Sequence, residues 1–168
     1  MPARKSQPFP QPGHDHRVCA ATALARAESL CTARGARLTE VRRKVLTLVW
    51  QSHTPVGAYA LLSSLNARGG RVAPIAVYRA LEFLIEHGLV HRIASLNAYV
   101  GCAHAGRDHA AQFLICRSCG MAAELDSAPL RKALTRAVAD RGFAVDQQIV
   151  EINGLCAHCL KPAKKTKR

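Results

Sequence analysis

Residues 74–101 read PIAVYRALEFLIEHGLVHRIASLNAYVG, and the spacing of apolar residues changes half-way along this stretch. From Val77 to Ile85 the apolar residues recur at the spacing of one buried helix face, and Gly88 is suited to end that helix. Two short apolar runs then follow, 89–93 and 97–100, separated by a polar turn, which is typical of a β-hairpin. The stretch therefore predicts a helix that is followed directly by a hairpin.

The residues before this stretch also have helical spacing. Helices are expected over about 17–34, after Thr39 as N-cap, and from Ala58 onward, with a proline-containing break before the last of these. Helices followed by a hairpin form the order of a winged helix-turn-helix, in which the last helix enters the major groove of DNA. Residues 16–101 are therefore predicted to form a DNA-binding winged-helix domain.

The basic charge of the chain lies mainly in the same region. The protein has 168 residues and a formal net charge of +13. Residues 1–99 contain 13 Lys and Arg against 5 Asp and Glu, whereas residues 100–160 contain six of each. Residues 161–168 add a short basic tail. A basic half joined to a neutral half indicates that only the first half meets a polyanion, here double-stranded DNA.

Two cysteine pairs of identical spacing mark the second half of the chain. They are Cys116-x-x-Cys119 and Cys156-x-x-Cys159. Two residues between cysteines allow both sulfur atoms to bind one tetrahedral ion, and two such pairs supply the four thiolates of a closed structural zinc site. A structural zinc ion is therefore expected to join the two ends of this half.

Between the cysteine pairs the sequence alternates between β and α patterns. Strands are expected over 112–115 and 121–125, then a helix capped by Ser127, then a strand over 143–152. An apolar helix beside a small sheet with open edges favours self-association as a homodimer. The expected fold class is α+β: the winged-helix domain plus a small zinc-stapled α/β dimerisation domain over 102–160.

The amino-terminal sequence indicates where in the cell the protein is located. Residues 1–15 contain four prolines, lack the apolar core of a signal peptide and are expected to be a disordered leader. No apolar run approaches the roughly 18 residues that span a membrane. A cytoplasmic protein without a membrane partner is therefore predicted, with cysteines that bind zinc instead of forming disulfides. His14 and His16, at the end of the leader, are not expected to bind metal.

Four short motifs follow one another between residues 37 and 159. They are Arg37-Leu-Thr39-x-x-Arg42, Ala76-Val77-Tyr78-Arg79-Ala80-Leu81, Cys116-x-x-Cys119-Gly120 and Gly154-Leu155-Cys156-x-x-Cys159. Together they resemble the ferric uptake regulator family of metal-sensing bacterial repressors. The run 78–91 and the Asn97-x-Tyr99-Val-x-Cys102 hairpin are most similar to the zinc-responsive branch. The resemblance implies a zinc-responsive transcriptional repressor and not an enzyme.

The resemblance also implies a second, regulatory zinc site. Its ligands would be His91, Cys102, His109 and Glu124, with His104 as the substitute for His109. One thiolate, two imidazoles and one carboxylate form a tetrahedral set that favours zinc over ferrous iron or manganese. The first two ligands belong to the wing and hinge and the last two to the second domain. Two zinc ions per chain are expected, and the second would hold the domains together.

Candidate DNA contacts follow from the helix positions. Tyr78 and Arg79, at the exposed start of the last helix, are the best candidates for reading bases, and Arg37, Arg42 and Tyr59 for holding phosphates. The expected partner is an AT-rich palindromic operator, with no small-molecule substrate. Two alternatives remain: a thiol- or peroxide-responsive regulator whose cysteine pairs release zinc on oxidation, and a zinc hydrolase, which needs an open coordination position.

Overall fold

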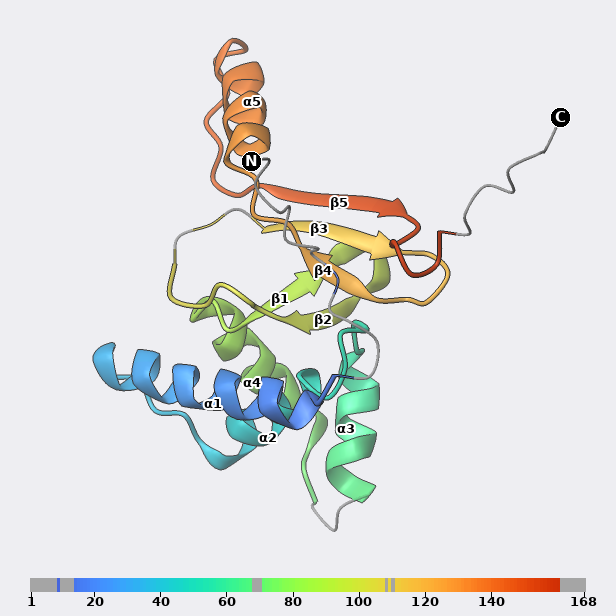
Figure 1. Ribbon diagram of the computed structural model, residues 1–168. Coiled ribbons are helices and arrows are strands. Elements are labelled where there is room, and N and C mark those ends of the chain that lie inside the picture. Colours follow the sequence, from blue (N-terminus) through green and yellow to red (C-terminus); the bar gives the residue numbers. More distant parts are fainter. Residues whose placement is uncertain (1–8, 10–13, 68–70, 108, 110, 161–168) are drawn as a thin grey trace, which may run out of the picture.

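The N-terminal part of the chain is helical in the computed structural model, which describes residues 9, 14–67, 71–107, 109 and 111–160. Its helices are α1 (His16–Ala33), α2 (Glu40–Val49), α3 (Ala58–Ala67) and α4 (Pro74–Glu86). Figure 1 shows them grouped at one end of the molecule. The expected basic tail lies outside the described residues, as does most of the expected leader. Within the described part, no helix is long and apolar enough to cross a membrane.

The helices pack through the apolar faces that the sequence indicates, except that Ile85, expected on the buried face of α4, is 38% exposed. Val45 and Val49 of α2 and Val77, Leu81 and Leu84 of α4 are at most 1% exposed and belong to one core cluster. Burying a Val or Leu side chain contributes about 1.5–3 kcal/mol. The contact between α2 and α4 therefore supplies a large part of the stability of the helical domain.

The ends of α2 and α4 lie where the sequence places them. Thr39 precedes α2 with an extended backbone, although its hydroxyl caps no amide among the described residues. Gly88 has a φ of 65°, and the Leu89 N–H donates to the Leu84 carbonyl at 2.8 Å. Glycine adopts this left-handed conformation without a Cβ clash, so the chain turns sharply out of α4.

The expected hairpin follows at once. β1 (Val90–Ile93) and β2 (Ala98–Gly101) are antiparallel and are joined by the 3-10 turn η1 (Ala94–Leu96). Asn97 closes the turn with a φ of 46°, a conformation that asparagine tolerates better than most residues. This hairpin is the wing of the winged-helix domain.

The C-terminal part is a three-stranded sheet with one crossover helix. β3 (Ala111–Cys116) lies in the middle, antiparallel to β4 (Ala122–Glu124) and parallel to β5 (Ile149–Gly154), with α5 (Ala128–Ala139) in the crossover. Cys116 lies opposite Gly154 in the β3–β5 register. Because these two strands are parallel, each leads into its cysteine pair at the same end of the sheet. The α+β fold class expected from the sequence is confirmed.

The strand expected over 143–152 is wrong in its first half. β5 begins at Ile149, and residues 143–148 are irregular. Ile149 is opposite Ala111, the first residue of β3, so the segment before it has no strand to pair with. The apolar side chains of this segment face the groove beside α5 instead.

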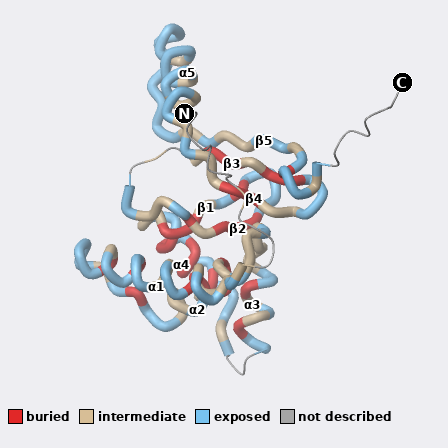
Figure 2. The backbone as a smooth tube through the Cα atoms, viewed as in Figure 1, coloured by how far each residue is buried: buried red, intermediate tan, exposed pale blue. Residues whose placement is uncertain are grey.

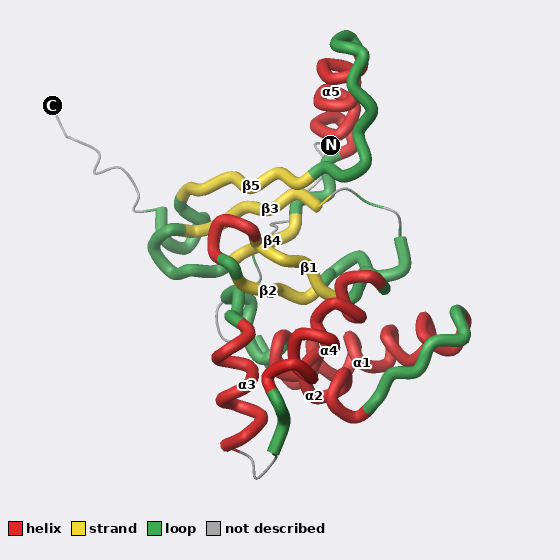
Figure 3. Tube along the Cα trace, turned by 180° about the vertical axis from the view of Figure 1, so that it is seen from behind, coloured by secondary structure: helices red, strands yellow, loops and turns green. Residues whose placement is uncertain are grey.

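The wing forms the junction between the two parts. Ile93 and Val100 of the wing are buried in one cluster with Phe113, Ile115 and Ala122 of the second sheet. Figure 3 shows the wing between the helices and the three-stranded sheet. In Figure 2 the buried segments follow β1 to β4 and the α2–α4 pair, whereas β5 and α5 are coloured as intermediate or exposed. One face of the wing is therefore used within the molecule, in contact with the second domain.

Candidate metal centres

The four cysteines of the two pairs converge at one end of the β3–β5 ladder. The Sγ atoms of Cys116, Cys119, Cys156 and Cys159 all lie within 4.8 Å of one another, and those of Cys119 and Cys156 are 3.9 Å apart. A tetrahedral zinc ion with Zn–S bonds of about 2.3 Å requires S···S distances of about 3.8 Å. None of the protein's seven cysteines, all within the described residues, forms a disulfide. The cluster therefore fits a zinc ion with no open position.

Backbone amides stabilise the thiolate form of one cysteine in this cluster. Amide groups of Cys119 and Cys156 point at the Cys116 sulfur and lower the pKa of that thiol to about 6. The Cys156 N–H donates to the sulfur at 3.4 Å. At neutral pH at least one sulfur is therefore a thiolate, the form that binds metal.

The second cluster contains the four residues implied for the regulatory site. His91 lies on β1, Cys102 follows β2, His109 precedes β3, and Glu124 ends β4. Their ligand atoms lie within 4.8 Å of one another. Two donors thus come from the wing side and two from the second sheet, so the cluster exists only while the two parts are held together.

The ligand atoms of this cluster face each other closely. His109 Nε2 is 3.4 Å from Cys102 Sγ, 3.3 Å from His91 Nε2 and 2.6 Å from Glu124 Oε1. The side chains of His109 and Glu124 are 10% and 4% exposed. Glu124 Oε1 is buried and, among the described residues, has no hydrogen bond of good geometry. Several lone pairs directed at one small volume are what a bound cation satisfies.

Neighbouring groups orient the ligands. His109 Nδ1 lies 2.8 Å from the Arg107 carbonyl, so an N–H there leaves the Nε2 lone pair free for metal. The Ala103 N–H donates to Glu124 Oε2 at 3.0 Å. Burial raises the pKa of Glu124, but His91 and this amide outweigh it and leave the pKa below its usual value. The carboxylate is thus ionised, with its other oxygen turned toward the imidazoles.

Cys102 differs from Cys116 in its proton affinity. Burial and the Glu124 charge raise the pKa of Cys102 to about 12. Its thiol is therefore protonated in the metal-free site, and metal binding there must release a proton.

His109 joins the second cluster and His104 does not. Their rings are neighbours, with centroids 5.7 Å apart, but His104 is not among the four converging donors. The assignment of His109 as the ligand therefore has the better geometry.

Glu151 makes a contact between the two parts that sequence reasoning missed. Its carboxylate on β5 accepts hydrogen bonds from the N–H groups of Ala94 and Ser95 at 2.7 and 3.2 Å. These amides begin η1 in the wing. A carboxylate beside the free amides of a helical turn is favourable, so Glu151 helps to hold the wing against the second sheet.

Comparison with known proteins agrees with this architecture. The profile of the ferric uptake regulator family matches residues 33–153. The chain belongs to this family. A relative, the zinc uptake regulation protein of Escherichia coli (strain K12), is 37% identical over 139 residues, which are 82% of this chain and 81% of the relative.

Solved structures extend the comparison of this ferric uptake regulator family member. A zinc uptake regulator complexed with zinc and DNA has a TM-score of 0.79 and 36% identity, over 83% of this chain and 94% of the other. The holo form of XcZur has a TM-score of 0.76 at 39% identity, over 83% and 97%. The apo form, at the same identity and coverage, has a TM-score of only 0.50. Since identity and coverage are equal, the lower TM-score reflects a different arrangement of the parts within the apo chain.

Three of the candidate DNA contacts of this family member are exposed, two on α4 and one on α3. Tyr78 and Arg79 are exposed on α4, and Tyr59, near the start of α3, is 75% exposed. Desolvation and the neighbouring Tyr59 raise the pKa of Tyr78. The two tyrosines therefore lie together, on a surface that includes Arg79.

The other two candidates lie before and within α2. Arg37 is exposed. The Arg42 guanidinium is 3.4 Å from the centre of the Phe83 ring and donates to the Arg37 carbonyl. Arg42 thus has intramolecular partners, and its phosphate contact stays a prediction.

Proposed function

We propose that this protein is a zinc-responsive transcriptional repressor that binds operator DNA as a homodimer. The observation that carries the proposal is the cluster of His91, Cys102, His109 and Glu124, whose donors come from both parts of the chain. The expectation of a zinc-responsive, DNA-binding transcriptional regulator is confirmed by the family and by the likeness to zinc uptake regulators. Regulators of this family are not enzymes.

Zinc binding is proposed at two sites per chain with different roles. The four-cysteine site is closed and lies within one domain, so its zinc is a permanent part of the fold. The mixed site fills only when zinc is plentiful. Its set of one thiolate, two imidazoles and one carboxylate suits zinc and leaves no open position for a substrate.

Filling the mixed site holds the winged helix in one orientation relative to the second domain. Its ligands would separate if the wing left the second sheet, so zinc and the closed arrangement favour each other. The greater similarity to holo than to apo XcZur supports the interpretation that this closed arrangement is the metal-bound one. Because coupling is reciprocal, DNA binding must tighten zinc binding by the same factor.

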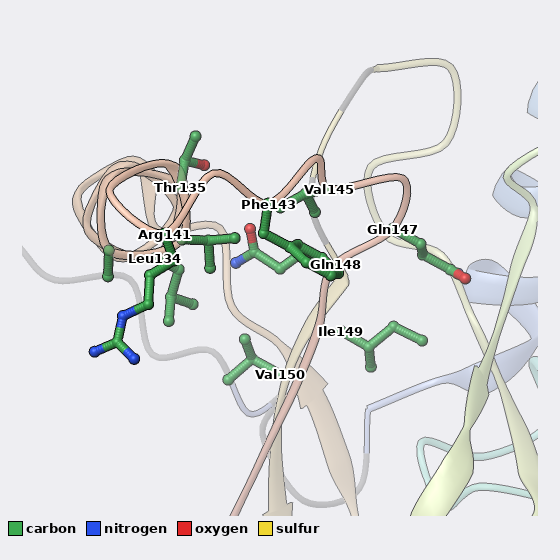
Figure 4. Close-up of a pocket in the computed structure, with 11 residues that line it drawn as sticks. Leu134, Thr135, Arg141, Phe143, Val145, Gln147, Gln148, Ile149 and Val150 are labelled. Carbon is green, nitrogen blue, oxygen red and sulfur yellow. The ribbon is translucent and has the colours of Figure 1, made fainter.

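A second copy of the chain is proposed to cover α5 and the neighbouring edge of the sheet. No residue of α5, which lies wholly within the described part, is buried, and Figure 1 shows this helix extending away from the rest of the molecule. β5 is an edge strand. Beside it, Phe143 and Val145 are 67% and 45% exposed. These residues help to line a groove of about 700 Å³ between helix and strand (Figure 4).

An edge strand with apolar neighbours is a surface that a protein usually pairs or covers. A twofold dimer formed there presents two winged helices to DNA. Two major-groove faces one turn apart are separated by about 34 Å. The proposed target is therefore a palindrome, and we propose an AT-rich one, as expected from the sequence. Tyr78 and Arg79 would read bases, with Arg37, Arg42 and Tyr59 near phosphates.

The proposal is tested by titrating zinc into chelator-treated protein that retains one zinc ion per chain, while binding to a palindromic operator is followed by fluorescence anisotropy. Operator affinity should rise as the second equivalent binds, by about 5- to 150-fold for a typical coupling free energy. Unchanged affinity would refute the zinc response. A random duplex of equal length serves as the DNA control.

The substitution Arg79→Ala separates zinc sensing from base reading in the same assay. The variant should bind both zinc ions but lose its preference for the operator over the random duplex, because arginine can grip guanine with two bonds. Preserved preference would show that Arg79 does not read bases.

A further inference from the structure

Three histidines from two separate segments meet beside the loop between α2 and α3, and none of them belongs to the regulatory cluster. His14 comes just before α1, His16 is the first residue of α1, and His53 lies in the loop between α2 and α3. Their ring centroids are 4.4, 4.9 and 5.2 Å apart. One nitrogen from each ring lies within 4.8 Å of the other two. We propose that these three imidazoles form a third metal site, which binds Zn²⁺ reversibly.

The nitrogen positions are close to those that a zinc ion requires. His14 Nε2 and His53 Nε2 are 2.9 Å apart. Two nitrogens on one tetrahedral zinc, with Zn–N bonds of about 2.0–2.1 Å, are about 3.4 Å apart. The two rings therefore need to separate by only about 0.5 Å to bind a shared ion, which is within the range of ordinary side-chain movement.

A second observation points to a ligand at the same place. His16 Nδ1 is buried and has no hydrogen-bond partner among the described residues. A buried polar atom left without a partner costs about 1–3 kcal/mol. A metal ion bound at this place would give that nitrogen a partner.

Asp15, the residue between the two N-terminal histidines, already has hydrogen-bond and ion-pair partners. Asp15 accepts from the backbone N–H of Arg17 at 2.8 Å and forms an ion pair with its guanidinium. The donor set is thus three imidazoles without thiolate or carboxylate. Such a set suits Zn²⁺, Cu²⁺ or Ni²⁺ and disfavours Mg²⁺ or Ca²⁺. With three protein ligands and water in the fourth position, the ion should exchange more readily than at either cysteine-containing site.

The position of His53 gives this site a structural consequence. Its carbonyl accepts a hydrogen bond at 2.9 Å from the N–H of Ala122, the first residue of β4. Trp50, at the start of the same loop, lies so close to Gly101 of β2 that a Cβ there would be 2.2 Å from the indole ring. The loop therefore touches both the wing and the second sheet. An ion bound by the three histidines would attach the start of α1 to this junction.

The test counts zinc ions in untagged, full-length protein. After equilibration with buffered Zn²⁺, wild type should bind three ions per chain, the third released first to a chelator of moderate affinity. His14→Ala/His16→Ala and, separately, His53→Ala should each bind two, with affinity for the third ion lowered by more than about 100-fold. His87→Gln, which changes a histidine that caps α4 and lies outside the three clusters, should keep all three.

Cobalt substitution identifies the ligands independently of stoichiometry. The third equivalent of Co²⁺ should add visible absorption without a thiolate charge-transfer band, because no sulfur is present in the set. Two ions in wild type, or a third ion that survives in both histidine variants, would overturn the proposal. The double variant alters only the start of α1, so it remains informative if His53→Ala fails to fold. A protein with two zinc ions and zinc-dependent DNA binding would refute only this third site.

Discussion

The two cysteine-containing clusters differ in how far apart in the fold their ligands originate. The four-cysteine cluster is built at one end of two adjacent, in-register strands, β3 and β5, of a single domain. The mixed cluster takes His91 and Cys102 from the wing side and His109 and Glu124 from the second sheet. A site within one domain can stabilise that domain, but only a site shared between domains can report and fix their relative position. This difference supports the proposal that the first cluster is structural and the second regulatory.

The largest effect should follow from breaking the four-cysteine cluster. Cys156→Ser should release its zinc ion and unfold the C-terminal domain. Structural zinc contributes apparent binding energies of about 10–16 kcal/mol, which is as large as the whole usual stability of a domain, about 5–15 kcal/mol. Zinc content and circular dichroism would measure the loss. Cys19→Ser, a half-buried cysteine on α1 outside the clusters, is the matched control. A folded Cys156→Ser variant with full zinc content would contradict the structural role.

Breaking the mixed cluster should have a smaller and different effect. Cys102→Ser should keep the fold and the tightly held zinc ion but lose the regulatory one, and with it the rise of about 5- to 150-fold in operator affinity. Calorimetric zinc titration and anisotropy would show the two losses together. His104→Ala should retain the response, since His104 lies beside the cluster without joining it. Loss of response in His104→Ala but not in His109→Ala would exchange the two ligand assignments.

Proton competition should also separate the clusters. The pKa of Cys102 is raised to about 12, so its thiol is protonated across the neutral range and must lose one proton for each zinc ion bound. The affinity of the mixed site should therefore rise about tenfold per pH unit between about pH 7 and 9, and fall as pH decreases. Zinc competition against a calibrated chelator at several pH values measures this slope. A flat profile would mean that the Cys102 sulfur does not bind the ion.

Much of the fold could be predicted because its determinants are local. Apolar spacing located α2 and α4, and Gly88 marked the turn from α4 into the wing. The strand expected over 143–152 was partly wrong because strand formation needs a partner. The apolar content of residues 143–148 is equally consistent with a face that packs on a helix or on another chain.

The two cysteine-containing metal sites also differ in how far the sequence could predict them. The spacing within Cys116–Cys119 and Cys156–Cys159 identifies a tetrahedral thiolate set from the sequence alone. The mixed ligand set has no such spacing and was proposed only through family resemblance. Glu151 and His53 were missed because their roles depend on which loops meet after folding. The residues next to them in the sequence give no information about these contacts.

The smallest effect should come from Glu151, which connects the two parts without binding metal. Glu151→Gln removes the charge that faces the amides of Ala94 and Ser95 and leaves a weaker acceptor. Hydrogen bonds to a charged group contribute about 1 kcal/mol more than neutral ones, so loss of the charge corresponds to a fall of about 5-fold in zinc-dependent operator affinity. Zinc content should not change.

Asp140→Asn is the control for this substitution, because it removes an equal charge from an exposed position at the end of α5. If both variants weaken operator binding equally, the effect is one of overall charge. If only Glu151→Gln does so, with both zinc ions still bound, the closed arrangement depends on contacts outside the metal site. Zinc binding at the mixed cluster would then determine when the domains close. The contacts of the wing would determine how stable the closed arrangement is.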